Sequence, residues 1–313
     1  MSTPRARWCL LLLALLVAAG DAGTAPTRRI AIIGASVSDG FGVRLRAAAP
    51  KADGTRPSVG VDLAALLRAA ASDPEGVSVS SHATSRFFLS PETVAKGSVR
   101  KVLLEKPTLV LAIDWLFWSS YGSRRADGEP VRNCDDRAER LERALAALQP
   151  LVDTGVPIVL GDLPDMHCSI DGGMLTEAMV PDAECLTRLN ARIRAWATER
   201  PTVALLDLGE VVRRTLAKEP IRACNRDWCE ADLGPLMQKD RLHPTLNGSM
   251  AVVAAALQAA DSKTDGAASK AFDLDPAKVR ARLAARGEQA ATGPSEAPPA
   301  PPAAADSSST SAP

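Results

Sequence analysis

Five short runs of almost wholly apolar, β-forming residues alternate along this chain with longer segments of helical periodicity. The runs cover residues 28–34, 77–81, 107–114, 156–162 and 202–208, and the helical segments cover roughly 60–71, 91–104, 135–153, 183–199 and 246–260. Uninterrupted apolar runs are typical of strands buried on both faces, and strands that alternate with helices form parallel sheets. We therefore expect an α/β protein, a three-layer α/β/α sandwich with a five-stranded, mainly parallel sheet.

The two ends of the chain differ from this pattern. Residues 1–23 combine Arg5 and Arg7 with an apolar run from Trp8 to Ala19 and then small residues, which predicts a secretory signal peptide. An uncleaved anchor is the alternative, but the run is shorter than the roughly 20 residues of a membrane span. Residues 24–262 form the predicted domain and 263–286 a short helical extension. The Ala/Pro/Ser-rich residues 287–313 predict a disordered tail.

Export predicts an oxidising compartment and a secreted or periplasmic protein. Five cysteines follow the signal peptide, which favours at least one disulfide and leaves one thiol over. Cys224 and Cys229 enclose a four-residue loop and are the first choice of pair, and two of Cys134, Cys168 and Cys185 can form another. No metal site is expected, because the sequence offers no CxxC pair to support one. The 37 basic and 37 acidic residues balance, which argues against a nucleic-acid partner.

The first apolar run ends in "AIIGASVSDGFG" (residues 31–42), at the edge of the sheet where functional groups collect. This stretch has three possible readings: a phosphate loop, a structural turn, or a turn that presents a nucleophile. It lacks both the GxGxxG pattern and a Lys-Ser/Thr pair, so a nucleotide cofactor is not expected.

A second stretch, "DRLHPTLNG" (residues 240–248), favours the nucleophile reading. A serine hydroxyl needs a base to remove its proton, and the base needs a carboxylate to fix its tautomer. Asp240 and His243 supply such a base and carboxylate three residues apart, and Ser36 follows the glycine that ends the first run. The non-catalytic alternatives are that Ser36 is a turn hydroxyl, that His243 is a surface histidine and that Asp240 caps a helix.

Together, "GASVSDGFG" and "DRLHPTLNG" resemble the first and last motif blocks of the SGNH, or GDSL, hydrolase superfamily. The resemblance covers about residues 28–260, with Ala35 where aspartate is usual. It implies a flavodoxin-like sandwich and an esterase with Ser36 as nucleophile, His243 as base and Asp240 as orienting acid. It also implies an oxyanion hole made by the Ser36 N–H, a second-block glycine and a third-block asparagine.

The middle blocks depart from that family pattern. The second region reads "SSHATSRFFLS", without glycine, and the third strand ends "LAIDWLFWSS", with Asp114 where the asparagine turn should begin. Substitute oxyanion or substrate-binding groups are the N–H of Ser85 or Arg86, the Arg86 guanidinium and the Asn190 side chain. Asp114 is either part of the site or a structural partner of Arg86 or Arg124. Asp162 and Asp165, after the fourth run, line the cleft or cap helices.

Four aromatic residues gather just after Asp114: Trp115, Phe117, Trp118 and Tyr121. They predict either a sugar platform or acyl pocket beside the site, or core packing below it. The sequence as a whole predicts an exported serine esterase without cofactor, acting on O-acetylated glycans or short-chain lipid esters. The alternatives are a degenerate domain that binds a glycan and a scaffold tethered by its tail.

Overall fold

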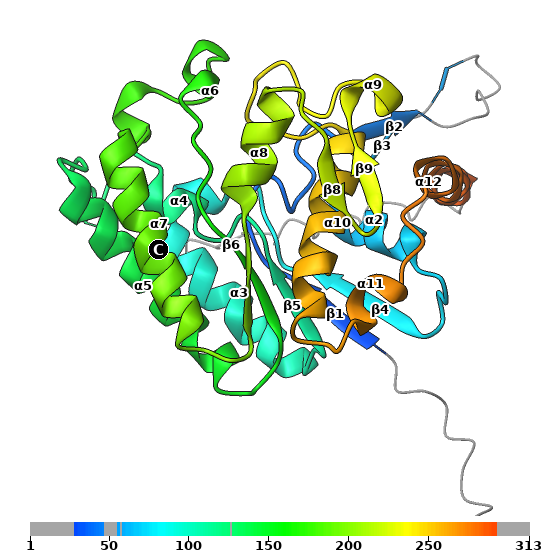
Figure 1. Ribbon diagram of the computed structural model, residues 1–313, viewed down its shortest axis with the longest axis horizontal. Coiled ribbons are helices and arrows are strands. Elements are labelled where there is room, and N and C mark those ends of the chain that lie inside the picture. Colours follow the sequence, from blue (N-terminus) through cyan, green and yellow to red (C-terminus); the bar gives the residue numbers. More distant parts are fainter. Residues whose placement is uncertain (1–27, 47–54, 57, 126, 293–313) are drawn as a thin grey trace, which may run out of the picture.

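The central element of the fold is a five-stranded parallel sheet, which confirms the predicted sandwich (Figure 1). The computed structural model describes residues 28–46, 55–56, 58–125 and 127–292. In sheet order the strands are β4 (Val77–Ser81), β1 (Arg28–Ile32), β5 (Leu109–Ala112), β6 (Ile158–Gly161) and β7 (Val203–Leu206). Every neighbouring pair runs parallel. Numbered along the chain, the order is the 2-1-3-4-5 of flavodoxin-like sheets, whose sites lie at the carboxyl ends of the strands.

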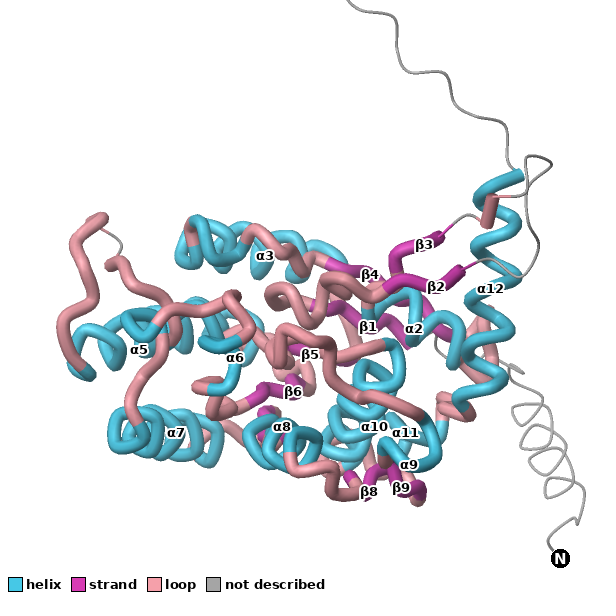
Figure 2. Tube along the Cα trace, turned by 90° about the horizontal axis from the view of Figure 1, so that it is seen from above, coloured by secondary structure: helices cyan, strands magenta, loops and turns pink. Residues whose placement is uncertain are grey.

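Helices cover both faces of this sheet (Figures 1 and 2). On one side α5 packs between α3 and α7, and on the other α10 packs against α2 and α8. Their bounds are α2 Leu63–Ala70, α3 Pro91–Glu105, α5 Cys134–Val152, α7 Ala183–Thr198, α8 Leu208–Leu216 and α10 Leu246–Asp261. The two layers explain why β5 and β6 are buried along their whole length.

Five of these six helices, all except α3, begin where the sequence supplies a side-chain acceptor. Asp62 accepts from the Ala65 N–H at the start of α2, and Asn133, Asp182 and Thr245 cap α5, α7 and α10 in the same way. Each such cap satisfies one of the free N–H groups of the first turn and is worth about 1 kcal/mol. The Thr245 cap fixes where α10 begins, directly after Pro244 and His243.

Several short elements were not predicted, because three or four residues are too few to give a periodic signal. They include the hairpins β2 (Arg44–Arg46) with β3 (Ser58–Gly60) and β8 (Ile221–Ala223) with β9 (Arg226–Trp228). The others are η1 Phe87–Leu89, α4 Phe117–Ser120, α6 Cys168–Asp171, η2 Glu177–Met179, α9 Glu230–Leu233 and α11 Ala267–Lys270.

The predicted helical extension packs on the domain. Helix α12 (Pro276–Thr292) buries Val279 and Leu283 and lies against α2, where Arg282 donates to the Ala69 carbonyl. It runs past residue 286 into the first positions of the predicted tail. The predicted signal peptide and the rest of the tail, from 293, lie outside the described residues. Within the described ranges, no helix has the length and apolar character of a membrane span.

The predicted pairing of Cys224 with Cys229 is wrong. The disulfide joins Cys134 to Cys185 and ties the first turns of α5 and α7 together. Cys224 and Cys229 are free, as is Cys168. The β8–β9 register pairs Ala223 with Arg226 and Ile221 with Trp228, so Cys224 lies in the turn and Cys229 beyond the open end. Two residues at opposite ends of a hairpin are too far apart for a disulfide, which needs Cα atoms within about 7 Å.

Candidate active site

Ser36, His243 and Asp240 lie together at the carboxyl edge of the sheet. Ser36 follows β1 and its Oγ is 2.9 Å from Nε2 of His243, a residue 207 positions later in the chain. On the other side of the ring, His243 Nδ1 is 2.8 Å from Oδ2 of Asp240. The His243 side chain is almost completely buried, whereas Ser36 is half-buried. The three side chains form one unbroken chain of hydrogen bonds.

Asp240 holds the imidazole through both of its oxygens. Oδ1 accepts from the backbone N–H groups of Leu242 and His243, each at 3.0 Å, while Oδ2 faces Nδ1. Partial burial opposes ionisation of the carboxyl, but the hydrogen bonds from His243 and Leu242 outweigh it and hold its pKa below the usual range. A carboxylate can only accept hydrogen bonds, so Nδ1 carries the proton and Nε2 is free to accept one from Ser36.

The loop that carries His243 is closed upon itself by Gln238. The Gln238 N–H donates to the His243 carbonyl at 2.8 Å, and its side-chain amide donates to the carbonyls of Pro244 and Phe41, both at 2.8 Å. The bond to the Phe41 carbonyl joins the two halves of the site, because Phe41 directly follows the turn of Ser36. The Gln238 side chain thus links the loop of His243 to the turn of Ser36.

Asp114 supports the Ser36 turn from below. Its carboxyl accepts from the N–H groups of Ala35, Val37 and Ser38, at 2.9, 2.8 and 3.3 Å, and from the Ser38 hydroxyl at 2.6 Å. Burial raises the pKa of this carboxyl, against the lowering effect of those four bonds. Arg86 and Arg124 do not contact it, so the pairing considered from the sequence is wrong.

Gly34 makes this close approach possible. Its φ is 157°, and a Cβ atom at this position would lie 2.1 Å from Oδ1 of Asp114 and 2.6 Å from Oγ of Ser38. Any larger residue would therefore displace the carboxylate that holds the turn. The glycine that follows β1 thus lets Asp114 hold the turn that carries Ser36.

Of the predicted oxyanion donors, the N–H of Ser36 is free of protein acceptors among the described residues, whereas the donors of Ser85 are already hydrogen-bonded. Among the described residues, the Ser36 N–H has no protein acceptor and is available to a ligand. Ser85 donates both its N–H and its hydroxyl to Asp39 of the Ser36 turn, at 2.8 and 2.5 Å. The loop that carries Ser85 and the exposed Arg86 therefore lies beside the nucleophile, but the Ser85 donors are engaged within the protein.

Asn190 and Trp115 have structural positions instead. The Asn190 side chain accepts from the Leu163 N–H and donates to the Leu163 carbonyl, at 2.9 and 2.8 Å, which ties α7 to the loop after β6. Trp115 is fully buried and its indole N–H donates to the Ala144 carbonyl. Neither side chain contacts Ser36. Their polar groups are hydrogen-bonded to backbone groups of the core and are not free to bind a substrate.

The aromatic cluster after Asp114 divides between core and surface. Trp115 and Tyr121 are fully buried, and Phe117 stacks on Tyr121 with ring centroids 4.2 Å apart. Trp118 is the partly exposed member, and its ring lies 5.6 Å from that of Phe88. The sequence did not single out Phe41, whose ring lies 4.5 Å from the His243 imidazole and is 44% exposed. Its position after the serine turn was the available signal.

A small apolar pocket of about 50 Å³ opens beside Ser36. Its lining side chains are almost all aliphatic or aromatic, and they come from the loops after β1, β5 and β6, from α8 and from the segment before and within α10. They include Val37, Phe117, Met166, Leu208, Val212 and Leu242. The pocket can hold a small apolar group next to the serine hydroxyl.

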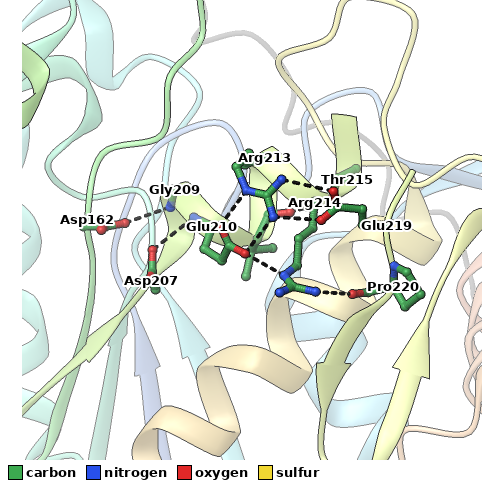
Figure 3. Close-up of polar contacts among 10 residues, drawn as sticks. Asp162, Asp207, Gly209, Glu210, Arg213, Arg214, Thr215, Glu219 and Pro220 are labelled. Carbon is green, nitrogen blue, oxygen red and sulfur yellow. Dashed lines mark hydrogen bonds and ion pairs between the residues drawn. The ribbon is translucent and has the colours of Figure 1, made fainter. Parts of the chain in front are cut away.

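Polar contacts fix α8, the helix that forms one wall of this pocket (Figure 3). Asp162 and Asp207 accept from the N–H groups of Gly209 and Glu210, at 2.8 and 3.0 Å. On the exposed face, Glu210 pairs with Arg213 and Arg214, and Arg213 also pairs with Glu219. Asp162 therefore caps a helix, and Asp165 pairs with His167 on an exposed loop.

Asp162→Asn is expected to change the pH dependence of stability. Burial raises the Asp162 pKa from 3.8 to about 6, so the folded protein loses stability as pH rises from about 4 to about 6 and this buried group ionises. Asparagine keeps the acceptor for Gly209 without the charge. The variant should gain up to about 3 kcal/mol relative to the parent between pH 4 and 7. Urea unfolding across this range measures the difference, and parallel stability curves would contradict it.

No metal centre is evident: within the described ranges, three or more histidine, cysteine, aspartate or glutamate side chains nowhere group as ligands.

No protein-family model matches the chain, and no curated protein matches it. Solved structures with a similar fold include LAE5, an alpha/beta hydrolase enzyme from the metagenome of Lake Arreo. It is 18% identical, with a TM-score of 0.47 over 77% of this chain and 98% of that one.

Two further solved structures are enzymes of related description. Axe2, an acetylxylan esterase from Geobacillus stearothermophilus, is 17% identical, with a TM-score of 0.45 over 75% of this chain and 95% of its own. A protein described as a GDSL-like lipase from Parabacteroides merdae is 12% identical, with a TM-score of 0.45 over 78% of this chain and 100% of its own. At these identities the likeness concerns the fold alone.

Proposed function

We propose that this chain is a serine hydrolase of the SGNH type that cleaves carboxylic esters through an acyl-enzyme. The supporting observation is the continuous line from Ser36 Oγ to His243 Nε2, at 2.9 Å, and from His243 Nδ1 to Asp240, at 2.8 Å. Both distances lie within the 2.6–3.2 Å needed for proton transfer between a nucleophile, its base and the orienting acid.

In the proposed first half-reaction, Ser36 Oγ attacks the ester carbonyl carbon while His243 Nε2 accepts the hydroxyl proton. The resulting oxyanion accepts a hydrogen bond from the Ser36 N–H, and Asp240 stabilises the imidazolium. The bond to the alcohol oxygen then breaks, and His243 returns the proton to the departing alkoxide. In the second half-reaction His243 Nε2 takes a proton from a water molecule as its oxygen attacks the acyl carbon. The bond from that carbon to Ser36 Oγ then breaks, the acid leaves, and His243 returns the proton to Oγ.

The pocket beside Ser36 favours a short acyl group. At about 50 Å³ it is far smaller than the 300–1,000 Å³ usual for ligand sites. We infer that acetyl esters are turned over faster than esters of long acyl chains. The substrate is proposed to be an O-acetylated glycan or a short-chain lipid ester outside the cytoplasm, as expected for an exported protein.

A fluorophosphonate probe tests the proposed nucleophile. The probe should form a covalent adduct on the tryptic peptide of residues 30–44, and fragmentation should place it on Ser36 and not on Ser38. Acetyl, butyryl and octanoyl chromogenic esters, assayed in parallel, then test the acyl preference. An unlabelled protein would favour the rival function, a glycan-binding domain that lacks catalysis. An adduct on another serine would show that Ser36 is not the nucleophile.

Phe41→Ala is expected to lower kcat/KM for an acetyl ester by about 2- to 10-fold, the range of an aromatic contact worth about 0.5–1.5 kcal/mol. The Phe41 ring covers the His243 imidazole and limits its movement. Phe41→Leu, which retains an apolar cover, should keep most of the activity. Steady-state kinetics measures both, and an alanine variant with parental kinetics would contradict this role.

A further inference from the structure

A second, larger cavity of about 470 Å³ is lined by residues of η1, α4 and α5 and of the segments that adjoin them, within the 300–1,000 Å³ usual for ligand sites. We call it the Trp118–Arg140 cavity; its defining residues are Phe88, Glu92, Trp118, Arg124, Arg125 and Arg140. Both of its walls continue from segments that hold the Ser36 turn. Phe88 follows the loop of Ser85, which binds Asp39, and Trp118 lies four residues after Asp114.

The cavity wall holds a buried positive charge without a negative partner. Arg140 is only 9% exposed, and it donates to the carbonyls of Trp118 and Gly122, at 2.5 and 3.4 Å. Among the described residues, no carboxylate forms an ion pair with it. Burial, followed by repulsion from Arg137, lowers the Arg140 pKa to about 10. A buried charge without a counter-charge is costly, so an anion that enters this cavity would be stabilised.

The other charged groups around the cavity do not neutralise the positive charge of Arg140. Glu92 is paired with Arg143 at 2.9 Å, and Arg125 with Asp136 at 3.1 Å. Arg124 is exposed and donates to the Gly128 carbonyl at 2.9 Å. The positive charge that is not paired with a carboxylate therefore lies on Arg140 and Arg124, two guanidinium groups that match the planar geometry of a carboxylate.

An aromatic surface lies beside this charge. Phe88 is 51% exposed and packs against Trp118, whose indole Nε1 is buried and has no acceptor among the described residues. An exposed aromatic face next to cationic donors suits a ligand that has an apolar face as well as an anionic group. A sugar ring that carries a carboxylate combines the two, because its C–H face packs on aromatic rings and its carboxylate accepts from arginine.

We propose that the Trp118–Arg140 cavity binds an acidic sugar residue of a polysaccharide, with the ring against Phe88 and Trp118 and the carboxylate toward Arg140 and Arg124. This inference deepens the proposed function, on which it rests for one point alone: that the bound polysaccharide is also the ester substrate. The acyl group would enter the small pocket beside Ser36, and the sugar that carries it would extend toward the cavity.

Calorimetric titration of the full-length Ser36→Ala protein tests the binding without catalysis. A tetrasaccharide of glucuronic acid should bind at least tenfold more tightly than a tetrasaccharide of glucose, and salt should weaken only the former. Arg124→Gln and Phe88→Ala, both at exposed positions, should each reduce the affinity for the acidic sugar by about tenfold. Arg222→Gln on the β8–β9 hairpin is the matched control and should bind like its parent.

Three results would overturn this assignment: equal affinity for the acidic and neutral tetrasaccharides, parental affinity in both cavity variants, or an equal loss of affinity in Arg222→Gln. Displacement of the sugar by inorganic phosphate, with no effect of Phe88→Ala, would also overturn it in favour of a site for free anions. Fluorophosphonate labelling of the Ser36-containing protein is scored separately. Binding without labelling contradicts the proposed function alone, and labelling without binding contradicts the cavity assignment alone.

Discussion

Ser36→Ala is expected to remove ester hydrolysis almost completely, with a fall in kcat of about 10⁶-fold, as for removal of the nucleophile from a serine protease. Without Oγ there is no atom within reach of His243 Nε2 to form the acyl-enzyme. Initial rates on an acetyl chromogenic ester, at enzyme concentrations high enough to detect this loss, measure the effect. Labelling by the fluorophosphonate probe should disappear together with activity.

Ser38→Ala is the control within the same turn. Its hydroxyl points to the buried Asp114 at 2.6 Å, so its loss should lower the unfolding temperature while probe labelling of Ser36 persists. The proposed assignment would be wrong if Ser36→Ala kept activity, or if Ser38→Ala lost labelling while Ser36→Ala retained it.

Asp240→Asn should lower kcat by about 10⁴-fold while the fold is preserved, if this site follows the behaviour of the serine-protease triad. The asparagine oxygen can still accept from the N–H groups of Leu242 and His243, so the turn is maintained. Its amide, however, would donate to Nδ1 and leave the ring proton on Nε2. That tautomer cannot accept the Ser36 proton, which is why the loss is chemical and not structural.

Asp165→Asn provides a matched control for this substitution. Asp165 contacts Nδ1 of His167 at 2.6 Å in a similar aspartate–histidine pair, but it is exposed and contacts none of Ser36, Asp240 and His243. Its loss should leave kcat unchanged. Thermal unfolding should show both variants folded. A fall of less than tenfold in Asp240→Asn would contradict the proposed orienting role.

The strands could be predicted from their uninterrupted apolar runs, and α2, α3, α5, α7 and α10 from their helical periodicity. The nine-residue α8 was not predicted, because it follows β7 directly and is too short to show a clear period. Ser36 and His243 could be paired in advance because their motifs end the first strand and precede the last helix, and parallel strands bring such ends to one edge. The role of Asp114 could not, because a single acid at a strand end can face an arginine or free N–H groups equally well, and only the packed turn shows that it faces Ala35, Val37 and Ser38. Nor could the disulfide, since the packing of α5 on α7 decides which thiols meet.

The proposed nucleophile, Ser36, and the proposed base, His243, come from opposite ends of the domain's sequence, 207 positions apart. A nascent chain that has emerged only as far as β7 already contains every strand of the central sheet, yet it has no histidine beside Ser36. Catalytic competence should therefore be acquired at the last stage of maturation, when the C-terminal segment closes over the sheet. Truncated or prematurely terminated copies would be inert toward esters, however well their strands had assembled.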